Sequence, residues 1–260
     1  MRLGRIQNNY TKEGFDEVLA QELSFIEICC NYDENGENLI NSVESVKSEI
    51  ERTKIPVSAV GRWNHHLQKD GIVDKNNEVL YHRLLDSAID LGAKSFVCGI
   101  NYDDSITFYK NCTNAINFFG GLIERAAGKI KIAVQNCHWN NFVLSPREWE
   151  VIMPELPDLC IKYDPSHAYN RDADYLSELS EWGERVAHVH LKGTVHAGKR
   201  KVSDPPAGMD DIAWGSVMAT LYSIGYDGDL SIEPHSAAWQ GERACGGILY
   251  TRDYFRKFII

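Results

Sequence analysis

The sequence predicts an α/β protein folded as a single (β/α)8 TIM barrel. Short apolar runs alternate with longer segments of helical periodicity, and the cycle repeats about eight times along the chain. Strands separated by single helices form parallel sheets, and eight such units fit a closed barrel better than an open, doubly wound sheet. The sequence has no GxGxxG motif after its first strand, which also disfavours a dinucleotide-binding sheet.

The expected strands are short apolar runs, several of which end in polar residues. In order they cover residues 3–9, 24–31, 55–63, 94–101, 130–138, 159–165, 185–192 and 228–235. The segments of helical periodicity that follow them are Lys12–Glu22, Ile40–Thr53, Asn76–Leu91, Thr107–Ala127, Pro146–Met153, Asp174–Gly183, Asp211–Ile224 and Ile248–Phe258. The Ser145-Pro146 pair is typical of a helix start. Because no linker or low-complexity segment interrupts the pattern, we expect one domain over residues 1–260.

Composition excludes several classes of protein. The chain has 27 basic and 37 acidic residues, a net charge of −10, which disfavours a nucleic-acid partner because phosphate contacts need Lys and Arg. No apolar run reaches the ~18 residues of a membrane span, and the first ten residues do not resemble a signal peptide. The seven cysteines form no CxxC pair, so a reducing, cytoplasmic location is expected.

Polar residues gather at the carboxyl ends of the expected strands, where barrels of this kind place their active sites. From the second strand onward they are Glu27; Arg62, Trp63, Asn64, His65 and His66; Asn101; Gln135 and His138; Asp164 and His167; His188, His190 and Lys192; Glu233 and His235. Asp, His and Glu from neighbouring strands suit a divalent cation such as Mn²⁺, Mg²⁺, Co²⁺ or Zn²⁺.

Three motifs in the second half of the chain, YDPSHAY, VAHVHLKG and LSIEPH, carry a family resemblance. In this order and spacing they resemble the xylose isomerase-like TIM barrels, a family of sugar-phosphate isomerases and epimerases. The stretch from Pro206 to His235 is similar to that family's seventh helix and eighth strand. The likeness is strongest over residues 130–240, and the repeated strand–helix pattern extends it along the chain.

The resemblance implies one divalent metal, with Mn²⁺ the first expectation, held at the ends of strands five to eight. The matching residues are Gln135, Asp164, His190 and Glu233, and the first departs from the family pattern, which has Glu there. An amide oxygen can bind a metal but cannot accept a proton at neutral pH. His188 and His190 alternate on one strand and so share a face, and the resemblance places the ligand second, at His190.

The resemblance also implies proton transfer at a carbon next to a sugar carbonyl. We expect Glu233 to be the base, with His167 and Lys192 as the other catalytic residues. Because Gln135 removes one of the family's two bases, a one-base reaction is favoured: aldose–ketose isomerisation, or elimination from a keto-sugar by a lyase. Epimerisation and a non-catalytic sugar-binding barrel stay open. A DNA-repair endonuclease, which shares the barrel, is disfavoured by the acidic composition.

The remaining site residues are expected to contact the carbohydrate: His138, His188, Trp63, Asn64, His65 and Arg200. Arg200 lies in the longest irregular segment, Thr194 to Asp210, which follows the seventh strand. A long loop at that place is typical of a substrate lid. The sequence leaves open the identity of the sugar and whether the chain forms a homo-oligomer.

Overall fold

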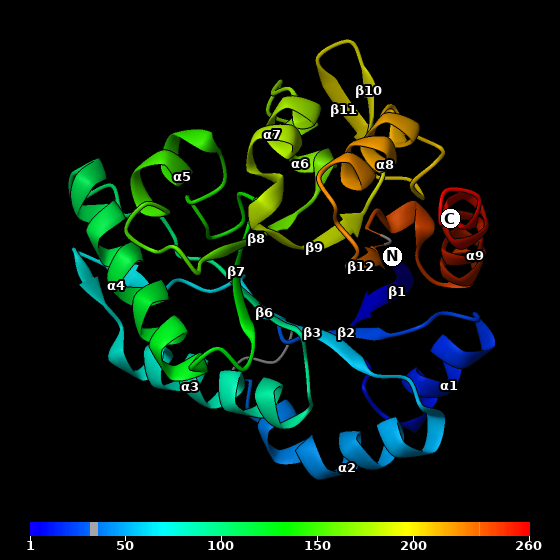
Figure 1. Cartoon of the computed structure of the whole chain (residues 1–260), viewed down its shortest axis with the longest axis horizontal. Coiled ribbons are helices and arrows are strands. Elements are labelled where there is room, and N and C mark those ends of the chain that lie inside the picture. Colours follow the sequence, from blue (N-terminus) through cyan, green and yellow to red (C-terminus); the bar gives the residue numbers. More distant parts are fainter. Residues whose placement is uncertain (32–35, 234) are drawn as a thin grey trace.

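In the computed structural model, which describes residues 1–31, 36–233 and 235–260, eight parallel strands close into a barrel ringed by helices (Figure 1). The order around the barrel is β1-β12-β9-β8-β7-β6-β3-β2, so the first strand pairs with the last. Arg2 pairs in parallel with Asp229, and Arg5 pairs with Ile26 on the other side. The predicted TIM barrel is confirmed.

The barrel strands agree in order and place with the expected runs. They are β1 Arg2–Gln7, β2 Ile26–Cys29, β3 Val57–Arg62, β6 Ser95–Cys98, β7 Lys131–Gln135, β8 Cys160–Tyr163, β9 Val186–Leu191 and β12 Asp229–Ile232. The α-helices are α1 Lys12–Ala20, α2 Glu37–Thr53, α3 Lys75–Asp90, α4 Phe108–Ala126, α5 Pro146–Ile152, α6 Pro165–Tyr169, α7 Tyr175–Trp182, α8 Trp214–Ser223 and α9 Glu242–Arg256. Short 3₁₀ turns lie at Gly183–Arg185 and Ala237–Trp239.

Local features differ from the expectation in several places, and one of them is the short helix α6 directly after β8. The expected irregular lid contains a hairpin, in which β10 Val195–Ala197 pairs with β11 Arg200–Ser203. A second hairpin, of β4 Gln68–Lys69 and β5 Ile72–Val73, lies between β3 and α3. The last helix begins at Glu242, six residues before the predicted start at Ile248. The sequence did not show this first part because Glu242 to Gly247 contains polar residues and glycines and lacks apolar periodicity.

The barrel wall separates two kinds of side chain. The outward-facing residues of the strands, such as Phe96, Ile132 and Val189, belong to a large apolar core shared with the helices. The inward face has only a small apolar cluster, which includes Ala59 and Trp63, and otherwise carries polar groups. None of the described helices combines the length and apolar character needed to cross a membrane.

Trp63 folds back into the barrel over Gly61 on the same strand end. Its ring is 5% exposed, and a Cβ added at Gly61 would lie 2.1 Å from Trp63 Cζ3. Glycine is therefore required at residue 61 for the indole to fill this space.

We expect Gly61→Ala to displace the Trp63 ring and to destabilise the fold by about 1–3 kcal/mol, the usual penalty for overpacking. The matched control is Gly121→Ala in α4, where nothing lies within 4 Å of the added Cβ. That variant should be neutral or slightly stabilising, since alanine favours helix interiors. Urea unfolding of both variants tests the expectation, and equal midpoints would contradict it.

Candidate metal centre and active site

His190 is fully enclosed and contacts a carboxylate on each side. It lies on the inward face of β9 and is fully buried. Its Nε2 donates to Glu27 Oε2 at 2.8 Å, and its Nδ1 lies 2.8 Å from Glu233 Oε2. Burial alone would lower the pKa of His190, but Glu27 and Glu233 outweigh burial and raise it. Because each ring nitrogen faces a carboxylate oxygen, the arrangement favours the doubly protonated ring.

Glu27, on β2, connects His190 to a second imidazole. Its Oε2 also accepts from His188 Nε2 at 2.8 Å, while Oε1 is buried without a hydrogen-bond partner among the described residues. Burial raises the pKa of Glu27, yet the two histidines bring it well below its ordinary value, so the carboxylate stays ionised. A carboxylate bonded to the far nitrogen of a histidine is a common way to orient a metal ligand.

Asp164 lies at the end of β8 and begins α6. Its Oδ1 accepts from the Ser166 N–H at 2.9 Å as a helix cap, which leaves Oδ2 for the site. Asn136 fixes the backbone of Asp164 through two hydrogen bonds of 2.9 Å, one donated by the Asp164 N–H and one accepted by its carbonyl. Burial raises the pKa of Asp164, but Lys192 and His167 lower it below its usual range, so it is ionised.

Lys192 and His167 form a buried pair beside Asp164. Lys192 Nζ donates to His167 Nε2 at 2.8 Å and lies 3.2 Å from Asp164 Oδ2. Burial and the Lys192 charge lower the pKa of His167 well below its usual value, so the imidazole is a neutral acceptor. Burial alone would lower the pKa of Lys192, but Asp164 and Glu233 raise it, so the side chain stays an ammonium.

Ligand atoms of Asp164, His190 and Glu233 lie within 4.8 Å of one another, as a cation site requires. Gln135, at the end of β7, is fully buried; its Nε2 donates weakly to the Trp139 carbonyl at 3.4 Å, and its Oε1 accepts no hydrogen bond from the described part of the chain. Two carboxylates and one imidazole, with an unpartnered amide oxygen at the end of the neighbouring strand β7, suit a hard divalent cation. The residues present therefore fit the expected metal.

The residues expected to contact substrate lie at different depths. His138 is exposed, with its ring centroid 6.3 Å from that of His167. Asn64 is exposed and accepts from Asn140 Nδ2 at 3.1 Å, and His65 beside it is half-buried. Arg200 is exposed on β11. Trp63 and His188 lie inside the barrel, so they are buried rather than at its rim.

Lys162 is an inward-facing residue of β8 that the expected site lacked. It is 1% exposed and stands two positions before Asp164, in the run LCIKYDP. Residues two apart on a strand share a face. The alternation that places His188 and His190 on one face therefore also places Lys162 and Asp164 on one face. This spacing is the sequence signal that could have identified Lys162 as a site residue.

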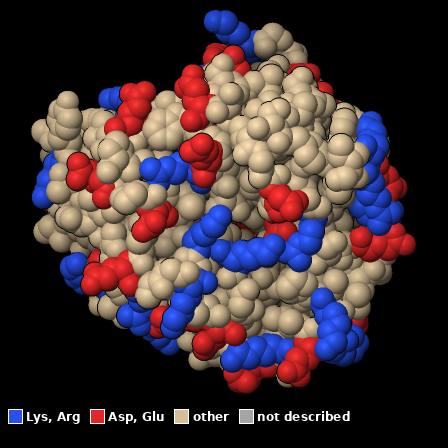
Figure 2. All heavy atoms as spheres, in the orientation of Figure 1, with Lys and Arg blue, Asp and Glu red and all other residues tan. Residues whose placement is uncertain are grey.

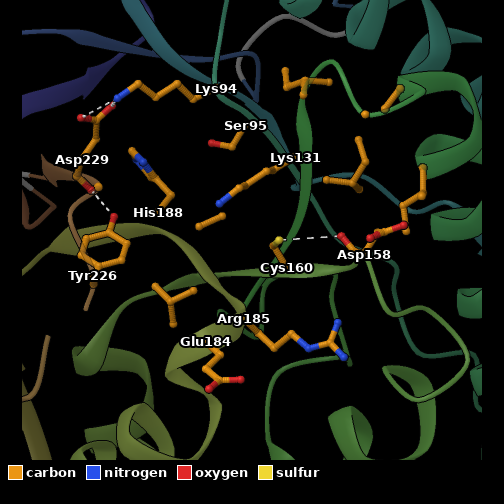
Figure 3. A pocket seen from close by; sticks show the side chains of 18 of the residues that line it. Lys94, Ser95, Lys131, Asp158, Cys160, Glu184, Arg185, His188, Tyr226 and Asp229 are labelled. Atoms are coloured by element: carbon orange, nitrogen blue, oxygen red, sulfur yellow. Dashed lines mark hydrogen bonds and ion pairs between the residues drawn. The ribbon is translucent and has the colours of Figure 1, made fainter. Parts of the chain in front are cut away.

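A cavity of about 1060 Å³ opens at the opposite, amino-terminal end of the barrel strands, between Ser95, Lys131, Cys160 and Asp229 (Figure 3). His188 lines it as well, which places this residue between the cavity and Glu27. The expected metal ligands are not among its lining residues. A short row of basic side chains crosses the middle of the face shown in Figure 2, with acidic side chains beside it and around the rim.

Comparisons with known proteins agree with the fold. A family described as xylose isomerase-like TIM barrel matches residues 15–252. The structure superposes on 3-keto-D-glucoside 4-epimerase from E. coli with a TM-score of 0.76 and 16% identity, covering 99% of both chains. No curated protein matches the chain in sequence.

Two further solved structures are D-psicose 3-epimerase from Clostridium cellulolyticum H10 and D-allulose 3-epimerase from Methylomonas sp. Each gives a TM-score of 0.79 at 14% identity, covering 100% of this chain and 99% and 98% of the other. Identities this low show the shared fold alone.

We expect Glu27→Gln to weaken binding of Mn²⁺ by about 10- to 100-fold, since the variant loses the charge that orients His190. Isothermal titration of the metal-free protein with Mn²⁺ measures this directly. Glu44→Gln, at a side chain that is 85% exposed, is the control and should bind like the wild type. Equal affinities for both variants would mean that Glu27 does not position the ligand.

Proposed function

Because the chain belongs to the xylose isomerase-like TIM barrel family, we propose that it is a metal-dependent enzyme acting on a sugar or keto-sugar, which removes a proton from the carbon next to a carbonyl. The observation that carries the proposal is the convergence of Asp164, His190 and Glu233 from three neighbouring strands. The proposed reaction class is isomerisation or epimerisation.

The proposed metal is one Mn²⁺, held by Asp164, His190, Glu233 and the Gln135 Oε1. A bound dication would polarise the carbonyl and so acidify the neighbouring C–H bond. Hard oxygen donors with a single imidazole favour Mn²⁺ or Mg²⁺ over metals that prefer sulfur. The amide contributes no charge, so the two carboxylates alone balance the dication.

Glu233 is the proposed base. Burial raises its pKa, but His190 and Lys192 bring it well below the ordinary value, so the carboxylate is ionised and able to accept a proton. Its side chain is 15% exposed, whereas those of Asp164 and His190 are fully buried, so it is the most accessible of the three to a substrate.

Lys192 and His167 together are the proposed proton donor, on the side of the substrate opposite Glu233. The ammonium is held 2.8 Å from His167 Nε2, so a proton lost by His167 to substrate is replaced from Lys192 without bulk water. The exposed residues His138, Asn64, His65 and Arg200 are the proposed sugar contacts at the rim. Trp63 and His188 are proposed to shape the floor of the site.

The second candidate is a lyase that eliminates a leaving group from a keto-sugar. Gln135 is the observation that favours it, because an amide cannot take a proton from the second face of the carbon. Elimination and aldose–ketose isomerisation both need one base, whereas direct epimerisation needs a second acid–base group. The 4-epimerase of 3-keto-D-glucosides has the same fold and indicates keto-glucosides as substrates to test.

We expect the wild-type protein with Mn²⁺ to exchange a carbon-bound proton of a ketose or 3-keto-glucoside for deuterium in D₂O. NMR reads the exchange and also identifies the product as an epimer, an aldose or an unsaturated ketone. Glu233→Gln should slow exchange by about 10²- to 10⁴-fold, the usual contribution of a general base. Glu150→Gln, at an exposed position of α5, is the matched control. Exchange that survives in the Glu233 variant would exclude this base.

Removal of the metal gives a test that needs no substrate. Mn²⁺ at 100 times its dissociation constant should add about 2.7 kcal/mol to the free energy of unfolding, and EDTA should reverse the gain. Thermal melts of wild type and Asp164→Asn, with and without Mn²⁺, measure this. Stabilisation should be much smaller in the variant, and a wild-type melt that Mn²⁺ does not shift would oppose a metal enzyme.

A further inference from the structure

Lys162 is a buried cation that the proposed reaction has not yet used. It lies on the inward face of β8, where it pairs in register with Gln135 on one side and His188 on the other. It is 1% exposed, as enclosed as Asp164 and Lys192. Cys160, two residues earlier, lines the cavity at the opposite barrel end, whereas Lys162 does not.

The ammonium of Lys162 forms no hydrogen bond or ion pair within residues 1–31, 36–233 and 235–260, and its described contact is the Trp63 ring, 5.7 Å from Nζ to the centroid. A cation–π contact of this kind recovers only a part of what an ammonium loses on leaving water. Buried lysines are normally paired. An unpaired lysine beside a set of metal ligands therefore indicates that its partner is a negative charge on a bound ligand.

Gln135 strengthens this assignment. Its Oε1 has no described hydrogen-bond partner either, and it occupies the strand position next to Lys162. A glutamate at residue 135 would be an anion beside the ammonium and would neutralise it. The amide instead leaves the positive charge of Lys162 available, and that charge acts on Asp164, Glu233 and His190 across the site.

We propose that Lys162 is a catalytic residue whose ammonium donates a hydrogen bond to the substrate oxygen that becomes negatively charged when the proton leaves. This inference rests on the proposed function. The C–H electron pair moves to form the carbon–carbon double bond, the carbonyl π electrons move to oxygen, and the proton goes to Glu233. Lys162 keeps its own protons and stabilises the oxyanion, which a fixed buried charge does more strongly than water.

A catalytic role can be distinguished from a structural one, because an unpaired buried charge that serves catalysis lowers the stability of the fold. Lys162→Met keeps the side-chain length and removes an unpaired buried charge. We expect kcat for deuterium exchange to fall about 100-fold with a smaller change in KM. The melting temperature should rise by about 2–4 °C. Lys131→Met on neighbouring β7, whose side chain points into the opposite cavity (Figure 3), is the control and should change neither.

Gln135→Glu in the two backgrounds tests the pairing of these residues. In the wild type the new carboxylate neutralises Lys162, so exchange should slow about 10-fold or more. In the Lys162→Met protein the same substitution should not slow exchange further, so the two effects are not additive. Additive effects, or a Lys162→Met protein that keeps wild-type kcat and melts at a lower temperature, would overturn the role of Lys162. Wild-type protein that exchanges no proton on any sugar would instead overturn the proposed function, and this role with it.

Discussion

The rest of the site depends on the two contacts that hold His190, one at each ring nitrogen. Glu27 holds one ring nitrogen from β2 and Glu233 faces the other from the end of β12, so three strands fix one imidazole. Residues 27 and 190 are 163 positions apart, and only closure of the barrel brings them together. A shift of one residue in β2 or β12 would turn a carboxylate out of the barrel, and a shift in β9 would turn His190 out.

Charge balance explains why so polar an interior is tolerated. The carboxylates of Glu27, Asp164 and Glu233 are opposed by Lys162, Lys192 and a protonated His190. Burying ions is costly unless each has a partner, and in the site all but Lys162 have one. The outward face of the same strands supplies the larger apolar core, so most of the apolar burial that stabilises the fold lies outside the barrel interior. The interior is therefore free to carry chemistry.

The sequence predicted the barrel well because its signals are local. Alternation of apolar runs with helical periodicity gave the strand order, and the HVH pattern on β9 placed His188 and His190 on one face, as the structure shows. The hairpin in the lid was missed because its strands are only three and four residues long, too short to show an alternating apolar pattern. Glu27 was noted only as a polar strand end without an assigned role, since its partners lie more than 160 residues away. Lys162 was missed although its spacing from Asp164 was visible. The roles of these residues in catalysis stay predictions.

The most direct test of the proposed metal centre is a crystal structure of the protein soaked in Mn²⁺, with anomalous data collected at the manganese edge. One strong peak is expected at bonding distance from Asp164, His190 Nδ1, Glu233 and the Gln135 Oε1, with Glu27 still bonded to His190 Nε2. A peak that Gln135 does not touch would contradict the ligand set. A peak among Cys137, His138 and His167, whose ligand atoms also lie within 4.8 Å of one another, would move the metal centre elsewhere.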